Sequence, residues 1–290
     1  MVKSLCIKTN NNKILDYLLN SLEDIDNIKV SKNKFKIYNN VIIHYLGNDI
    51  NGFYDKLSDI IYNLIIIFYE KKLLSRLVNS NYFYFLDFEK KQIVDLCLDI
   101  INSDEFNDDS NQNIKDSRKI AIKKGVYEYF RQNKQMILDG FINFRLRSYL
   151  KILDYSTDIG VNKFIIEREY IEFIKLLKLY IETNSSNIDM VHLIYSNKTS
   201  FLTDENKNLI KVDDDIFNVK YLSDISFSSN DYTLNALLTL LPQKIYIHLI
   251  DEEDEFINTL KLIFDKRIVL CTNCDICNFY SKKLYKLKIK

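Results

Sequence analysis

Three of the five cysteines in this 290-residue chain, Cys271, Cys274 and Cys277, stand within seven residues of one another. Thiolates two residues apart in a turn can face one metal ion, so three of them can supply most of a zinc site or part of an iron–sulfur cluster. The C-x3-C-P continuation of bacterial ferredoxins is absent, because Cys277 is followed by the sequence NFY. Three roles fit the cysteine cluster: a metal site, a redox or disulfide function, and reduced structural thiols.

A tetrahedral site needs a fourth ligand, and His248 is the best candidate within the chain. It lies near the end of a predicted strand at 244–250, and a second strand is predicted at 267–270, directly before Cys271. If these strands are parallel neighbours, their carboxyl ends share one edge of the sheet, which places His248 near Cys271. Cys6, a water molecule or a second chain are alternatives for this position. Cys6 and Cys97 otherwise fit small core residues, and His44, His192 and His248 each fit a packed strand.

Charged side chains among dense apolar residues form a second candidate group: Arg145, Arg147, Glu167 and Glu169. A buried charge without a partner costs too much free energy, so these groups must reach solvent or pair with one another. A pair such as Arg145 with Glu169 would satisfy both across a helical hairpin. Structural pairing is the role we favour, and an interaction surface and a catalytic acid–base site are the alternatives.

Composition excludes several classes of protein. The 40 basic and 40 acidic side chains cancel, which argues against a general nucleic-acid binder. The chain has 5 Gly, 1 Pro and no GxGxxG, GxxxxGK or GxSxG motif, so Gly-dependent nucleotide-binding and hydrolase sites are not expected. The longest apolar run, 60–69, is too short to span a bilayer, and no signal peptide is recognised. We therefore expect a cytoplasmic protein.

Hydrophobic periodicity predicts an α+β fold. Residues 1–102 form an N-terminal α+β region that begins with a β-α-β-β unit, whose last two strands turn at Asn39 and Asn40. Residues 103–116 are an acidic linker or surface loop. Residues 117–184 form a long helical hairpin with a break near Gly160. Residues 185–290 form a C-terminal β-rich, α/β region that ends in the cysteine cluster.

The segments GFINFRLRSY at 140–149, FIIEREYIEFIKLL at 164–177, LPQKIYIH at 241–248 and CTNCDIC at 271–277 together resemble the YtxC-like family of sporulation proteins of endospore-forming bacteria. The resemblance covers most of the chain from about residue 117 onward and is weaker before it. It implies an association with sporulation, and it brings no established activity or catalytic residue with it.

These observations lead to a soluble, non-enzymatic interaction or structural factor with protein partners in sporulating cells. The alternative is a metal-binding protein in which Cys271, Cys274, Cys277 and His248 hold zinc or an iron–sulfur cluster. A weaker alternative is an enzyme or nucleic-acid factor with its site at the C-terminal strand ends, the usual ligand position in α/β sheets. No residue is predicted to be catalytic.

Overall fold

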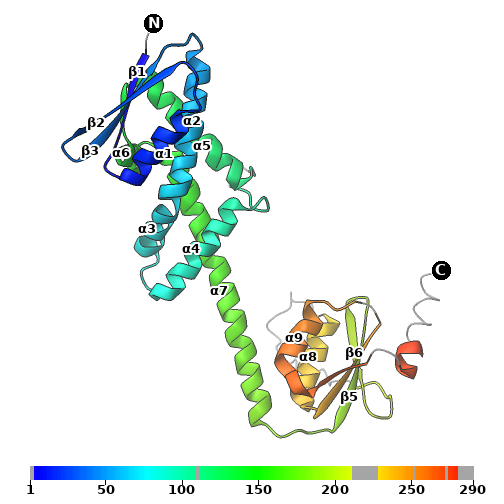
Figure 1. Cartoon of the computed structure of the whole chain (residues 1–290). Coiled ribbons are helices and arrows are strands. Elements are labelled where there is room, and N and C mark those ends of the chain that lie inside the picture. The colour runs from blue at the N-terminus through cyan, green and yellow to red at the C-terminus, as the bar shows by residue number, and fades with distance from the viewer. Residues whose placement is uncertain (1–2, 109–110, 211–227, 251, 272–273, 280–290) are drawn as a thin grey trace. The chain divides into compact units, whose positions relative to one another are not determined.

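Two separate hydrophobic cores divide the chain into two compact units, Met1–Glu167 and Arg168–Lys290. The computed structural model describes residues 3–108, 111–210, 228–250, 252–271 and 274–279 (Figure 1). Strands lie near both ends of the sequence and helices dominate the middle, which confirms the expected α+β fold. Within the described residues, no helix is both long enough and apolar enough to cross a membrane.

The first unit begins with the predicted β-α-β-β arrangement. Its elements are β1 (Lys3–Thr9), α1 (Asn12–Leu22), β2 (Ile28–Phe35) and β3 (Tyr38–Tyr45), and β4 (Gln135–Ile137) completes a sheet of order β2-β3-β1-β4. The expected turn at Asn39 and Asn40 is wrong, because both residues pair within β3. The chain reverses instead at Lys36, which adopts a left-handed conformation with φ of 53°.

Helices make up the rest of the first unit. They are α2 (Ile50–Ile65), a π-helical turn η1 (Ile66–Glu70), α3 (Lys71–Asn81), α4 (Asp87–Asn102), α5 (Ile114–Gln132), α6 (Leu138–Phe144) and the first part of α7 (Arg147–Thr183). The acidic segment at 103–116 joins α4 to α5 inside this unit. Each helix turns apolar residues inward; for example, α1 buries Ile14, Leu18 and Leu22 at the four-residue spacing of one helix face.

The predicted hairpin with a break near Gly160 is wrong, because α7 runs without interruption from Arg147 to Thr183. Gly160 is buried inside this helix against Cys97 of α4, and a β-carbon added there would lie 2.6 Å from the Cys97 sulfur. The glycine therefore permits close helix packing and does not end the helix. One helix then contributes to both cores, through Tyr149 and Leu153 in the first and Ile174 and Ile181 in the second.

A buried ion pair stands in the helical core of the first unit. Arg118 of α5 donates to Glu70 of η1 at 2.7 Å, and both side chains are almost fully enclosed. Tyr149 donates a further hydrogen bond to Glu70 at 3.1 Å, and the Arg118 guanidinium also reaches Asn102 at 3.1 Å. These partners offset much of the cost of burying the two charges, and the Arg118 Nε–H remains buried without a hydrogen-bond partner among the described residues.

The second unit is a four-stranded sheet of order β6-β5-β7-β8. Its strands are β5 (Met190–Ser196), β6 (Thr199–Thr203), β7 (Lys244–Leu249) and β8 (Ile268–Cys271), and its helices are the end of α7, α8 (Ser229–Leu240), α9 (Glu255–Phe264) and the short 3-10 turn η3 (Asp265–Arg267). Strands β5, β7 and β8 are parallel, whereas β6 is antiparallel to β5.

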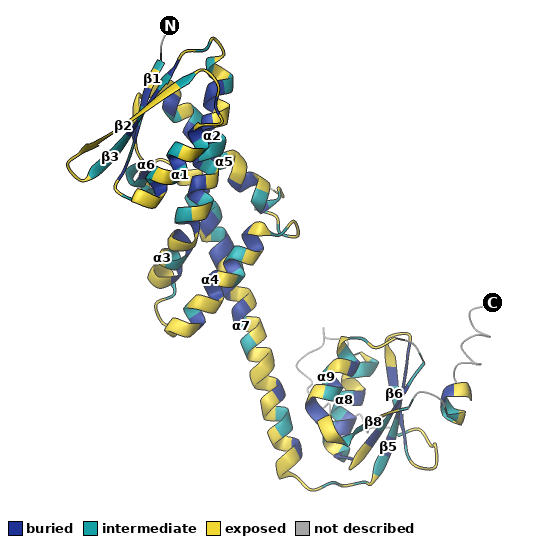
Figure 2. Ribbon diagram, viewed as in Figure 1, coloured by how far each residue is buried: buried dark blue, intermediate teal, exposed yellow. Residues whose placement is uncertain are grey.

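Alternation along the strands gives this sheet two different faces. Val191, Leu193 and Ile247 lie in the second core with residues of α8 and α9. Figure 2 shows these two helices beside the sheet, with buried stretches on both helices and strands. The intervening residues, including His192, Ile194 and His248, consequently project from the opposite face. This opposite face therefore carries the two histidines, His192 and His248.

Candidate metal centre

The cysteine cluster and His248 come from two neighbouring parallel strands and the short helix that follows them. In the ladder between β7 and β8, His248 lies directly opposite Cys271. Cys274 precedes a short helix at 275–279, and the helical hydrogen bond from Asn278 N–H to the Cys274 carbonyl, at 2.9 Å, turns Cys277 back toward the sheet. Strand register and one helical turn thus position all four side chains.

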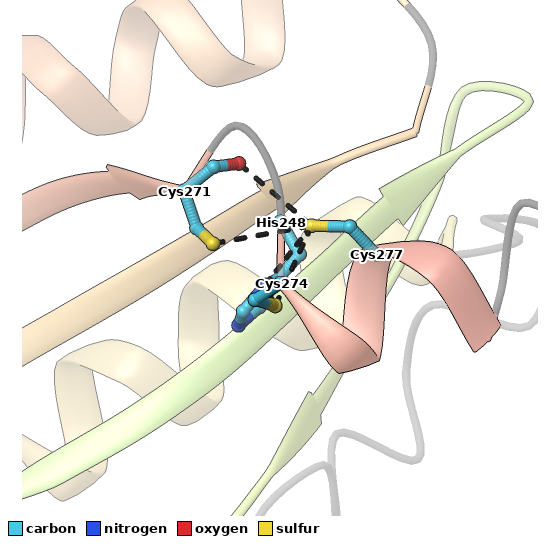
Figure 3. A group of neighbouring side chains, drawn as sticks. All are labelled: His248, Cys271, Cys274 and Cys277. Carbon is cyan, nitrogen blue, oxygen red and sulfur yellow. Dashed lines mark hydrogen bonds between the residues drawn. The ribbon is translucent and has the colours of Figure 1, made fainter.

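The four donor atoms converge on one point. Figure 3 shows the three thiols grouped around the imidazole of His248. The Nδ1 atom of His248 lies 3.3 Å from the Cys274 sulfur and 3.4 Å from the Cys277 sulfur. The Cys277 sulfur is 3.7 Å from that of Cys274 and 4.0 Å from that of Cys271, and all four donors lie within 4.8 Å of one another.

These separations fit a single tetrahedral ion. Ligand atoms about 2.3 Å from a zinc ion at tetrahedral angles lie about 3.8 Å from one another. The ligands of an iron–sulfur cluster are divided among two or more iron atoms, so all four would not converge on one point. Three cysteines and one histidine are also a ligand set typical of structural zinc.

The burial of the site favours a neutral imidazole. His248 and Cys277 are 2% and 6% exposed, whereas Cys271 and Cys274 are half-buried. Burial, with a smaller effect of His192, lowers the pKa of His248 to about 4. Its nitrogen lone pair is therefore available at neutral pH, as metal binding requires.

The thiols do not ionise equally without a cation. Burial, followed by hydrogen bonds with Cys274 and Cys277, raises the pKa of Cys271 to about 11. Burial also opposes ionisation of Cys274, but hydrogen bonds from the Cys277 backbone and the neighbouring thiols outweigh it and lower the pKa of Cys274. A divalent cation would offset the repulsion among three thiolates, which otherwise limits ionisation.

His192 is a member of the site that the sequence analysis did not single out. Its Nδ1 atom lies 2.9 Å from Nε2 of His248, the ring nitrogen that faces away from the thiols. Metal-bound histidines commonly use this second nitrogen to hydrogen-bond an acceptor that fixes the ring. One signal was present in the sequence: both histidines precede Leu-Ile in a predicted strand, as Val-His-Leu-Ile and Ile-His-Leu-Ile.

The other candidates lie elsewhere. Cys6 lies in β1 and Cys97 is buried in α4, both in the first unit, and neither belongs to the donor group. His44, on β3, hydrogen-bonds Ser4 at 2.8 Å.

The structure does not bring the four charged candidates together. Arg145, Arg147, Glu167 and Glu169 are all exposed to solvent. The expected pairing of Arg145 with Glu169 required a hairpin; on the continuous helix α7, positions 147 and 167 are separated by a rise of about 30 Å.

Comparison with known proteins places the chain in a family. The family model of the YtxC-like family matches residues 55–269. The uncharacterized protein YtxC of Bacillus subtilis (strain 168) is 22% identical over 196 residues, which cover 66% of this chain and 68% of that protein. No solved structure matches the chain.

The matched region includes His192 and His248 and ends two residues before Cys271, so it does not cover the three cysteines of the donor group. The match nevertheless extends through most of both compact units. The chain belongs to the YtxC-like family.

Proposed function

We propose that this protein binds one zinc ion through the sulfur atoms of Cys271, Cys274 and Cys277 and Nδ1 of His248. The observation that carries the proposal is the convergence of four suitable donors within 4.8 Å of one another. Zinc is preferred because sulfur and imidazole ligands at tetrahedral spacing suit this ion.

The zinc ion has a structural role in this proposal. Four protein ligands complete a tetrahedral shell and leave no open position for water or substrate, as in structural zinc sites. The ion would tie the short helix at 275–279 to the carboxyl ends of β7 and β8. Because that helix has few residues of its own to bury, metal ligation would supply much of the free energy that holds it there.

Elemental analysis of anaerobically purified protein tests the proposal. The native chain is expected to contain about one zinc per chain, and Cys277→Ser is expected to lose it because serine is a poor zinc ligand. Cys6→Ser is the matched control, since Cys6 lies in β1 outside the donor group. Native protein without zinc, or Cys277→Ser with undiminished zinc, would contradict the proposal.

We also propose that the protein serves as an interaction factor during sporulation. The family resemblance supports this role, and so does a set of α7 side chains that neither core uses: Ile166, Phe173 and Leu176 are 67%, 50% and 64% exposed. Exposed apolar side chains on a helix suit a protein partner.

Spore counts test this second role. A sporulating strain that carries Phe173→Glu together with Leu176→Glu is expected to yield fewer heat-resistant spores than one with Lys175→Glu, an exposed control on the same helix. Equal counts in the double variant, the control and the native strain would contradict an interaction role for this helix.

A further inference from the structure

A cavity of about 380 Å³ adjoins the metal centre within the second unit. Ile194 of β5 and Thr203 of β6 line it from the sheet, and Lys207 lines it from the loop after β6. Asp275, Ile276 and Phe279 line it from the short helix that follows Cys274. Its volume lies within the range of small-molecule sites.

Thr203 supplies a polar group that the fold itself does not use. The residue is 5% exposed, and its hydroxyl is buried without a hydrogen-bond partner in the structure. Buried hydroxyls are almost always hydrogen-bonded, because an unpaired one destabilises the folded state. The hydroxyl itself is closed to solvent, so it reaches a ligand in the cavity only after the Thr203 side chain rotates. Because it has no partner among the described residues, that rotation breaks no hydrogen bond with them.

The remaining lining residues define the chemistry of that ligand. Lys207 and Asp275 are exposed and offer one positive and one negative charge. Ile194 is 1% exposed and, with Ile276 and Phe279, provides apolar wall. A complementary ligand carries an anionic group for Lys207, a cationic group for Asp275 and an apolar body.

We infer that this cavity binds a small zwitterion with an apolar body, the class to which free amino acids with apolar side chains belong. The carboxylate would meet Lys207, the ammonium group would meet Asp275, and the Thr203 hydroxyl would hydrogen-bond one of them. The inference rests on the proposed function in one respect: Asp275 and Ile276 lie between two zinc ligands, so the ion would hold this wall of the cavity in place.

Titration of the zinc-loaded full chain with L-leucine and with L-phenylalanine, followed by calorimetry and by saturation-transfer NMR, tests the inference. At least one of the two is expected to bind saturably. 4-Methylpentanoate and 3-phenylpropanoate, which lack the ammonium group, and isoamylamine and phenethylamine, which lack the carboxylate, are expected to bind at least tenfold more weakly. Absence of binding by both amino acids, or equal binding of the acids or the amines, would overturn it.

Variants locate the binding in this cavity. Thr203→Val keeps the shape of the side chain and is expected to weaken binding roughly fivefold without lowering the unfolding temperature, because it removes a hydroxyl that has no partner. Lys207→Met is expected to weaken binding roughly tenfold, whereas Lys244→Met, an exposed lysine at the start of β7, should leave it unchanged. Unchanged affinity in both Thr203→Val and Lys207→Met would overturn the inference.

Zinc content measured on the same samples separates the two proposals. Zinc at one per chain without amino-acid binding would refute the ligand cavity and leave the metal centre standing. Saturable binding by a protein without zinc would refute the metal centre and leave the cavity standing.

Discussion

His192 contacts the ring nitrogen of His248 that faces away from the thiols. Its Nδ1 accepts or donates a hydrogen bond at Nε2 of His248, and Nδ1 of His248 remains directed at the cysteines. If His248 donates from Nε2, its Nδ1 lone pair is free for a metal. His192 is thus a positioning residue in our account and touches no ion itself.

His192→Ala is expected to weaken zinc affinity by about 10- to 100-fold, because the His248 ring loses the partner that orients it. Competition with a chromophoric chelator measures this affinity. His192→Gln, which keeps a hydrogen-bonding group on the same face, should recover part of the loss. His44→Ala, which alters a histidine of the first unit, should leave the affinity unchanged, and an unaltered affinity in His192→Ala would contradict the positioning role.

At the residue level, most members of the candidate metal centre could be predicted from the sequence. Cysteine spacing and two predicted strand ends are enough to indicate Cys271, Cys274, Cys277 and His248. The shared His-Leu-Ile sequence marks His192 and His248 as similar strand positions. The choice of Nδ1 and the contact between the two rings depend on the register of β5 against β7 and on side-chain rotation, which the local sequence does not determine.

The long helix α7 shows that a glycine can either weaken a helix or allow a neighbouring helix to pack closely against it. Glycine destabilises helix interiors, so the sequence alone predicts a break near Gly160. In the structure it allows α7 to approach α4 closely enough to enclose the Cys97 thiol. That contact joins residues distant in sequence, so local propensity alone could not reveal it.

Gly160→Ala is expected to lower the free energy of unfolding by about 1–3 kcal/mol, because the new methyl group must displace a buried sulfur. Gly140→Ala is the matched control: nothing lies within 4 Å of its added carbon, so the helical preference of alanine should raise stability by roughly 0.5–1 kcal/mol. Urea unfolding followed by the helical circular dichroism signal measures both. Adding Cys97→Ala should restore much of the loss, and a neutral Gly160→Ala would contradict this packing.

The strands and helices at the two ends of the chain could be predicted from the sequence, whereas the boundary between the two compact units could not. Alternating apolar residues identified β7 and β8, and helical spacing identified α9 between them. The boundary between the two units falls inside α7, after Glu167, where the sequence has neither a proline nor a polar linker. Only the separate membership of the two hydrophobic cores reveals it.

Because the cores are separate, zinc removal is expected to destabilise the second unit alone. Chelation should increase amide hydrogen exchange in β7 and β8, while β1 and β3 of the first unit keep their protection. Free zinc at about 1,000 times its dissociation constant stabilises a folded state by about 4 kcal/mol, and this contribution disappears on chelation. Equal loss of protection in both units, or none in the second, would contradict this arrangement.

Cobalt substitution tests the central claim most directly, because the spectrum of Co²⁺ reports the number and kind of its ligands. Titration of the reduced, zinc-free chain should give intense tetrahedral visible bands and sulfur-to-cobalt charge-transfer bands that saturate at about one ion per chain and disappear when zinc is added. Weak bands of octahedral cobalt, or no saturation near one ion per chain, would contradict a site built from Cys271, Cys274, Cys277 and His248.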